Sequence, residues 1–230
     1  MAALAVSTYA TPLAVRPMIW AIVAGMSGGI ALAIFYRALS LGQMGLTAPV
    51  AALVGAAIPT AVGIIAEGLP DFMHISGFLL AGLGIWLISR SEEGSSVRGI
   101  GMAALSGMGF AGFYLGMKAA GEGSPLWLAT FSRTGALAMT ATIVLSQRKF
   151  SEINRNSAGW AVLAGCLDVT GTACFVRASQ IGRLDAAVVL TSLYPAVTVV
   201  LARLVLAEHF TRWKTVGMLA ALLAVPLIAG

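Results

Sequence analysis

The chain has 230 residues, of which 59% are hydrophobic and only 10% are charged, and its mean hydropathy is +0.92. A water-soluble domain needs a polar exterior, and this composition cannot supply one. The fourteen Lys and Arg residues give a net charge of +5, but they are scattered singly between apolar segments, which is typical of membrane loops rather than of a nucleic-acid-binding surface. We therefore expect an integral membrane protein without a nucleic-acid partner, surrounded by a lipid bilayer, in the bacterial inner (cell) membrane.

Eight apolar segments follow one another along the chain, separated by turn residues. A helix needs about 20 apolar residues to cross the hydrocarbon core, whereas the alternation of polar and apolar residues that indicates a membrane β-barrel is absent. The predicted fold class is therefore an all-α membrane bundle of about eight transmembrane helices. After a lead-in at 1–16, these helices are expected near 17–39, 46–67, 73–90, 98–119, 125–146, 158–178, 186–207 and 212–229.

An internal repeat links the two ends of the chain. Part of FYRALSLG (Phe35, Arg37, Ala38, Gly42) returns 140 residues later in FVRASQIG (Phe175, Arg177, Ala178, Gly182). Each copy continues into a Pro-containing apolar helix, an Ala-Glu pair and a Gly-bearing final helix. The second copy also has two earlier helices, at 98–119 and 125–146, that the first copy lacks. The predicted domains are thus a partial three-helix repeat at 17–90 and a complete five-helix repeat at 98–230.

The Lys and Arg residues outside the hydrophobic segments give an orientation. One predicted face carries Arg16, Lys118 and Arg183, and the other carries Arg90, Arg98, Arg148, Lys149, Arg155, Arg212 and Lys214. Because cytoplasmic loops are enriched in positive charge, we expect the second face in the cytoplasm and the C-terminus outside. The two Ala-Glu turns then lie on opposite faces, as inverted repeats require.

These motifs resemble the drug/metabolite transporter superfamily, specifically its EamA type, over residues 17–230. They read FYRALSLG, APVAALVGAAIP, AEGLPD and GFLLAGLGIWLIS in the first half, and FVRASQIG, LTSLYPAVTVVLARLVLAEHF and GMLAALLAVPLIAG in the second. The resemblance implies two inverted five-helix repeats in which the first, third and fourth helices of each repeat line a central cavity. It also implies secondary transport by alternating access. The chain departs from this pattern because the first two helices of repeat one are missing.

Asp168 is the most informative single residue, because it lies near the middle of a predicted membrane helix. An ionised carboxylate is costly there and normally faces a cavity or a partner. Arg133 is the expected partner, since both residues lie roughly 12 to 15 Å from the same membrane face at a rise of 1.5 Å per residue. A structural ion pair and a site that handles substrate or protons both remain open. The resemblance matches both residues to positions of the family pattern.

The other candidate binding residues lie on helices equivalent to the cavity helices of the family. Lys118, with Tyr114 one turn away, combines a cation with an aromatic ring, which suits an organic acid or an amino acid. Its alternative is a basic side chain that reaches the lipid headgroups. Tyr36, Thr191 and Tyr194 add hydroxyl groups, although hydroxyls in membrane helices commonly bond to backbone or to neighbouring helices. No catalytic residues, cofactor or metal site are expected.

Three functional classes remain. The favoured one is a secondary transporter that moves small organic metabolites, such as amino acids, amines or related solutes. The second is a truncated chain that folds without transporting, or that is completed as a homodimer, because two helices are missing. The third is an intramembrane hydrolase, since GMSGG at 25–29 fits the G-x-S-x-G pattern. We expect no enzyme, because both histidines, His74 and His209, fall in predicted loops and leave the pattern without a base.

Overall fold

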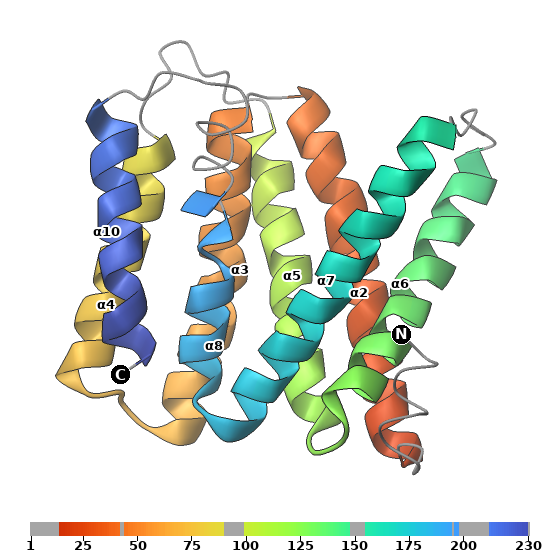
Figure 1. Ribbon diagram of the computed structural model, residues 1–230, viewed down its shortest axis with the longest axis horizontal. Coiled ribbons are helices and arrows are strands. Elements are labelled where there is room, and N and C mark those ends of the chain that lie inside the picture. Colours follow the sequence, from red (N-terminus) through yellow and green to blue (C-terminus); the bar gives the residue numbers. More distant parts are fainter. Residues whose placement is uncertain are drawn as a thin grey trace. The chain divides into compact units, whose positions relative to one another are not determined.

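The computed structural model describes residues 14–41, 44–89, 99–147, 155–194, 196–197 and 212–229. Within these ranges all the regular structure is helical, which confirms the predicted all-α fold class (Figure 1). The helices are α2 (Val15–Leu41), α3 (Met44–Glu67), α4 (Phe72–Ser89), α5 (Ile100–Ala120), α6 (Pro125–Gln147), α7 (Arg155–Ile181), α8 (Leu184–Thr191) and α10 (Arg212–Ala229). Five of them, α2, α3, α5, α6 and α7, are long and apolar enough to cross a membrane, and α4 and α10 are shorter apolar helices. The chain is accordingly an integral membrane protein.

The helix predicted over 186–207 is wrong in its continuity. It begins as α8, but α8 ends at Thr191 and the chain turns at Ser192 and Leu193. The Leu193 N–H donates to the Leu190 carbonyl at 3.2 Å. This bond spans three residues, as in a 3₁₀-helix, whereas an α-helical bond spans four. Pro195 follows, and because it has no N–H it cannot donate to the Thr191 carbonyl as a helix requires. Residues 198–211 lie outside the described part of the chain, as do the loops at 90–98 and 148–154.

The helix boundaries follow the same interval as the repeated motifs. Helices α2 and α7 each have 27 residues, and α4 and α10 each have 18. The paired first residues are Val15 and Arg155, Met44 and Leu184, and Phe72 and Arg212. Each second member of a pair starts 140 residues after the first, which is the interval between FYRALSLG and FVRASQIG.

The chain divides into two compact units that interleave in sequence. The first unit takes the chain up to Ile30 together with Gly112–Ile181, and the second takes Ala31–Ala111 together with the chain from Gly182 onward. The boundaries cut through α2 and α5. Each unit therefore contains helices from both of the repeats predicted at 17–90 and 98–230.

Close helix contacts hold the first unit together. Helix α6 packs against α7, and α2 crosses α6 so tightly that only glycine fits. A Cβ atom on Gly25 would lie 1.7 Å from the Ser132 carbonyl oxygen, and one on Gly135 would lie 2.2 Å from that of Ile22. Small residues let backbones approach in this way, which is how helices associate in a membrane without a hydrophobic driving force.

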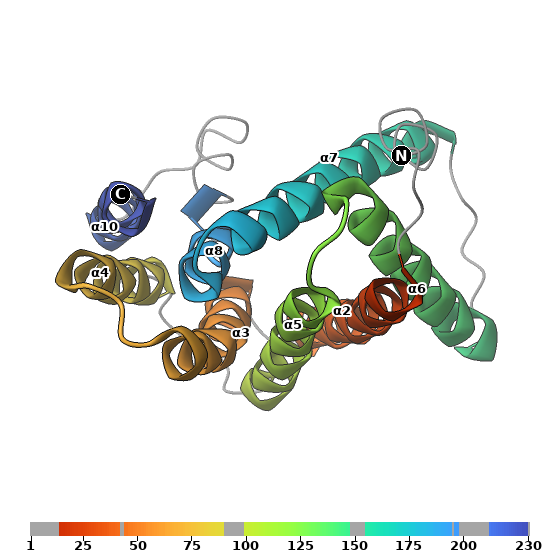
Figure 2. The same ribbon diagram turned by 90° about the horizontal axis from the view of Figure 1, so that it is seen from below.

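In the second unit, α4 lies along α10 and α3 lies along α8, as both Figure 1 and Figure 2 show. A Cβ on Gly84 would lie 2.8 Å from the Gly217 carbonyl oxygen, so the α4–α10 pair also packs through small residues. The buried core of this unit joins α4, α8 and α10 with residues that follow α8 in the chain. Its members are Ala81, Ile85, Val189, Leu193, Ala196, Ala221, Ala224 and Ile228.

Candidate functional site

An ion pair lies in the middle of the first unit. Asp168 is the central residue of the 27-residue helix α7, which places it roughly 20 Å from either helix end at a rise of 1.5 Å per residue. Arg133 Nη1, from α6, is 3.0 Å from Asp168 Oδ2. The pairing that was predicted from the matched depths of the two residues is therefore present.

The guanidinium group of Arg133 is fixed on several sides. Its Nη2 atom donates a hydrogen bond to Thr172 Oγ1, one turn beyond Asp168 on α7. Its Cζ atom lies 5.9 Å from the centroid of the Phe113 ring, within the range of a cation–π contact. The Nε atom is buried and has no hydrogen-bond partner among the described residues. Thr172 and Phe113 thus orient the cation, and neither was singled out from the sequence.

The two charges differ in their exposure. The Arg133 side chain is 32% exposed, whereas that of Asp168 is 56% exposed. The described part of the protein therefore does not enclose the carboxylate, although the residue sits at the centre of an apolar helix. Hydrocarbon cannot solvate such a group, so it requires water in a cavity or a polar partner.

Tyr114 and Lys118, the predicted pair of an aromatic ring and a cation, both contact α7. Tyr114 is buried, with its ring centroid 5.0 Å from that of Phe175 and 5.5 Å from that of Phe113. Lys118 instead donates from Nζ to the Ser179 carbonyl at 3.2 Å, in the last turn of α7. A cation at a helix C-terminus interacts favourably with the exposed carbonyls there. The tyrosine thus belongs to the aromatic cluster beneath Arg133, and the lysine to the end of a helix.

The remaining three candidates lie in the second unit. Tyr36 is exposed on α2 and contacts the ring of Phe35. Thr191 donates to the Ala187 carbonyl of its own helix at 2.7 Å, which is the structural alternative for such a hydroxyl. The Tyr194 hydroxyl donates to the Ala48 carbonyl at 3.1 Å and so links the turn after α8 to the first part of α3.

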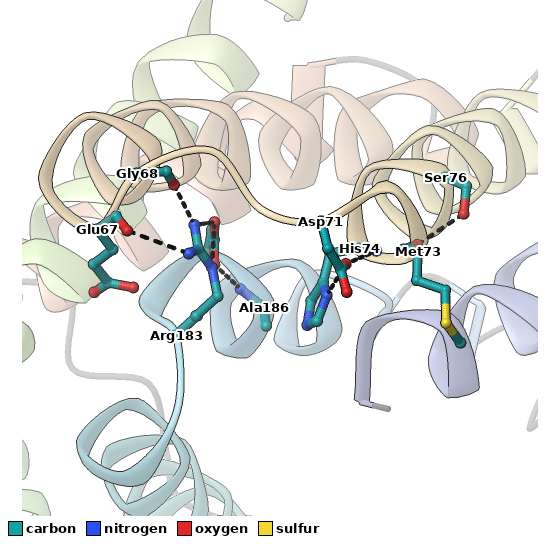
Figure 3. Close-up of polar contacts among 9 residues, drawn as sticks. Glu67, Gly68, Asp71, Met73, His74, Ser76, Arg183 and Ala186 are labelled. Carbon is teal, nitrogen blue, oxygen red and sulfur yellow. Dashed lines mark hydrogen bonds and ion pairs between the residues drawn. The ribbon is translucent and has the colours of Figure 1, made fainter.

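A charged cluster that the sequence analysis missed joins the C-terminus of α3 to the N-terminus of α8 (Figure 3). We call it the Arg183 clamp; its members are Arg183, Asp185, Glu67 and Gly68. Arg183 Nη2 donates to Asp185 Oδ2 at 2.8 Å and to the Gly68 carbonyl at 2.7 Å. In return, Glu67 Oε2 accepts the Leu184 N–H at 3.3 Å. Each helix end is thereby capped from the other helix.

Asp185 is the buried centre of this clamp. Its side chain has 0% exposure, and its Oδ1 atom also accepts the Ala186 N–H at 2.8 Å. Gly63 makes room for it on α3, since a Cβ there would lie 3.3 Å from the Asp185 Cβ. The hydrogen bond with Asp185 raises the pKa of the Arg183 guanidinium above its ordinary range. An acid in the first turn of a helix, two residues after an Arg, was the available signal in the sequence.

His74 lies in the first turn of α4, which agrees with the helix predicted near 73–90 and not with the loop position assumed in the argument against a hydrolase. Its backbone N–H donates to Asp71 Oδ1 at 2.9 Å, and its Nδ1 atom is 2.6 Å from the same oxygen (Figure 3). Asp71 thus caps the N-terminus of α4. These bonds, the backbone one first, lower the pKa of the Asp71 carboxyl below its ordinary value. The other histidine, His209, lies outside the described residues.

The hydrolase pattern does not have the local structure that its chemistry needs. Ser27 lies inside the continuous helix α2, whereas a nucleophile elbow places its serine on a sharp strand-to-helix turn. A Cβ on Gly112 would lie 2.6 Å from Ser27 Oγ, so the hydroxyl packs closely against the neighbouring helix. In the described ranges, no group of three or more His, Cys, Asp or Glu side chains is placed to hold a metal ion.

Comparisons with known proteins agree with this architecture. Residues 97–230 match the model of the EamA-like transporter family, while no curated protein matches the sequence. A solved structure titled "Crystal structure of protein" aligns with a TM-score of 0.68 and 16% identity, over 99% of this chain and 92% of that one. At that identity the likeness shows a shared fold alone. The family match covers more than half of the chain, which therefore belongs to the EamA-like transporter family, within the drug/metabolite transporter superfamily.

Proposed function

We propose that the chain is a secondary transporter that carries small organic metabolites, such as amino acids, amines or related solutes, across the bacterial inner (cell) membrane by alternating access. Family membership supports a transporter-like function in general. The observation that carries the specific proposal is the Arg133–Asp168 pair at the centre of α7, with its carboxylate more than half exposed. Charged residues inside membrane helices normally line the path of a polar substrate.

The periodicity of the helices supports the alternating-access part of the proposal. Inverted repeats allow a transporter to reach two related states by exchanging the conformations of its halves. Here the paired helices start 140 residues apart, and two of the three pairs, α3 with α8 and α4 with α10, pack directly against each other. The repeats at 17–90 and 98–230 are the proposed exchanging halves.

Flux measurements in liposomes test this function. The purified protein would be reconstituted and supplied in turn with labelled amino acids, amines and nucleosides, with empty liposomes as the blank. We expect saturable, protein-dependent uptake of at least one solute, and a loss of at least about tenfold in Asp168→Asn. The matched control is Asp71→Asn, which removes an exposed acid in a loop and should leave uptake unchanged. Folded protein without flux for any solute, or full activity in Asp168→Asn, would contradict the proposal.

A further inference from the structure

We propose that Asp168 binds the substrate through a protonated amine, so that the transported solutes are organic amines and not organic anions or amino acids. This inference rests on the proposed function and specifies the substrate class of the same site. It follows from which atoms of the ion pair are already engaged, from the space beside the carboxylate, and from the sign of the charge left exposed.

Arg133 is already held by the protein at both terminal nitrogens. One terminal nitrogen binds Asp168 and the other donates to Thr172, which is buried on α7. The third nitrogen, Nε, is buried, and the face of the guanidinium lies over Phe113. A substrate carboxylate would have to compete with Asp168 and Thr172 for the two terminal nitrogens.

Asp168 is in the opposite situation. Its Oδ2 atom binds Arg133, but its Oδ1 atom has no hydrogen-bond or ion-pair partner in the described part of the chain. A carboxylate can accept bonds at about four lone-pair positions, so most of this capacity is unused. The more accessible end of the ion pair is therefore the negative one, and a ligand must offer it a hydrogen-bond donor.

Among the residues that the structure describes, none crowds the surface of α7 at the two glycines that flank Asp168. Gly165 and Gly171 lie three residues before and after it, within about 60° of the same helix face at 3.6 residues per turn. A Cβ atom at either position would meet no other atom within 4 Å, apart from the adjoining backbone. A small solute can therefore reach the carboxylate along this face. Gly159 is equally uncrowded, but it points about 180° away from Asp168.

The chemistry of the exposed oxygen selects the ligand. An ammonium group forms a charge-assisted hydrogen bond with a carboxylate, and this bond strengthens where water is scarce. An organic anion would meet a like charge, and the carboxylate of an amino acid would have to share Arg133 with Asp168 and Thr172. The bound species is accordingly a small organic amine in its protonated form.

Binding to the purified protein tests this without any need for flux. Titration calorimetry would compare three probes that share a phenylethyl group, namely 2-phenylethylamine, 2-phenylethanol and 3-phenylpropionate, with phenylalanine as the amino acid. We expect the amine alone to bind measurably, and its Kd to rise at least tenfold in Asp168→Asn. Gly165→Leu should weaken binding similarly by filling the open face, whereas Gly159→Leu should not. This glycine pair decides the question if Asp168→Asn does not fold.

Each result has a distinct meaning. Tighter binding of the acid or the amino acid, no binding of the amine by the wild type, or equal effects of the two glycine variants would overturn the assignment of substrate class. Amine binding that depends on Asp168, together with an absence of flux for every solute, would instead overturn the proposed transport function and leave the amine site standing.

Discussion

Replacing Arg183 with Gln is expected to destabilise the protein more than replacing Asp185 with Asn, although both changes break the same ion pair. Asp185 is fully buried, whereas Arg183 is 26% exposed. Arg183→Gln therefore strands a buried carboxylate. Asp185→Asn leaves a cation that keeps its hydrogen bond to the Gly68 carbonyl and can extend toward water.

The burial of each partner determines how large the difference in free energy of unfolding should be. Removing one partner of a buried ion pair typically costs about 3 to 5 kcal/mol, and we expect Arg183→Gln to fall in that range. For Asp185→Asn we expect a loss of about 1 to 2 kcal/mol. The amide retains an oxygen that can accept the Ala186 N–H, and a typical hydrogen bond contributes about 1 kcal/mol. The two variants should thus differ in their free energy of unfolding by about 2 kcal/mol.

Unfolding by SDS in mixed micelles, followed by circular dichroism, measures both values. The double variant Arg183→Met with Asp185→Leu should recover most of the loss, because it leaves neither charge without a partner. Glu122→Gln serves as the control for removing an exposed acid, in the loop between α5 and α6. Equal losses in the two single variants, or a double variant as unstable as the sum of both, would refute the reasoning.

Three further predictions concern stability. Gly25→Val should lower the free energy of unfolding by at least about 1 to 3 kcal/mol, because its Cβ would overlap a backbone oxygen on α6; Gly165→Val, in open space, is the control, and equal losses would contradict the close crossing. Because the pKa of Asp71 is lowered on folding, its ionised carboxylate stabilises the folded protein at pH values above the ordinary pKa of 3.8. This stabilisation is lost as the pH falls through the lowered pKa. The wild type should therefore melt above Asp71→Asn near neutral pH and lose that advantage in acid, whereas a constant difference would argue against the cap. Tyr194→Phe should cost about 0.6 kcal/mol, since it removes the neutral hydrogen bond from Tyr194, after α8, to the Ala48 carbonyl of α3. A loss several times larger in an SDS titration would contradict this assignment.

The depth of a residue in the membrane could be predicted from the sequence, but the side of the helix on which it lies, and so its neighbour, could not. Counting residues from the turns placed Arg133 and Asp168 at the same level, and the structure pairs them. The same counting places Tyr114 one turn from Lys118, but it does not tell that the tyrosine ring meets Phe175 or that the lysine donates to the Ser179 carbonyl. Helices that are apolar on all sides carry no stripe that tells which face meets which neighbour. The exposure of Asp168 depends on which face of α7 is covered by a neighbouring helix, and the sequence does not indicate that face.

The end of α8 was also not predicted from the sequence. The apolar run at 186–207 has the length of a spanning helix, and hydropathy alone does not register the turn after Thr191. The Arg183 clamp was hidden for a different reason. Its partners Arg183 and Gly68 are 115 residues apart in the chain, and a contact between two loops leaves no periodic pattern in either of them.

The two aspartates of α7 and α8 show how the satisfaction of hydrogen bonds separates a structural charge from one that is available to a ligand. Asp185 is fully buried and has both oxygens engaged, by Arg183 and by the Ala186 N–H. Such a group has nothing further to bind, and its removal should register as a loss of stability. Asp168 is more than half exposed and receives one nitrogen on one oxygen. The described part of the protein leaves the solvation of that carboxylate incomplete, so water or a substrate is expected to supply the rest. Removal of Asp168 should therefore register first in binding.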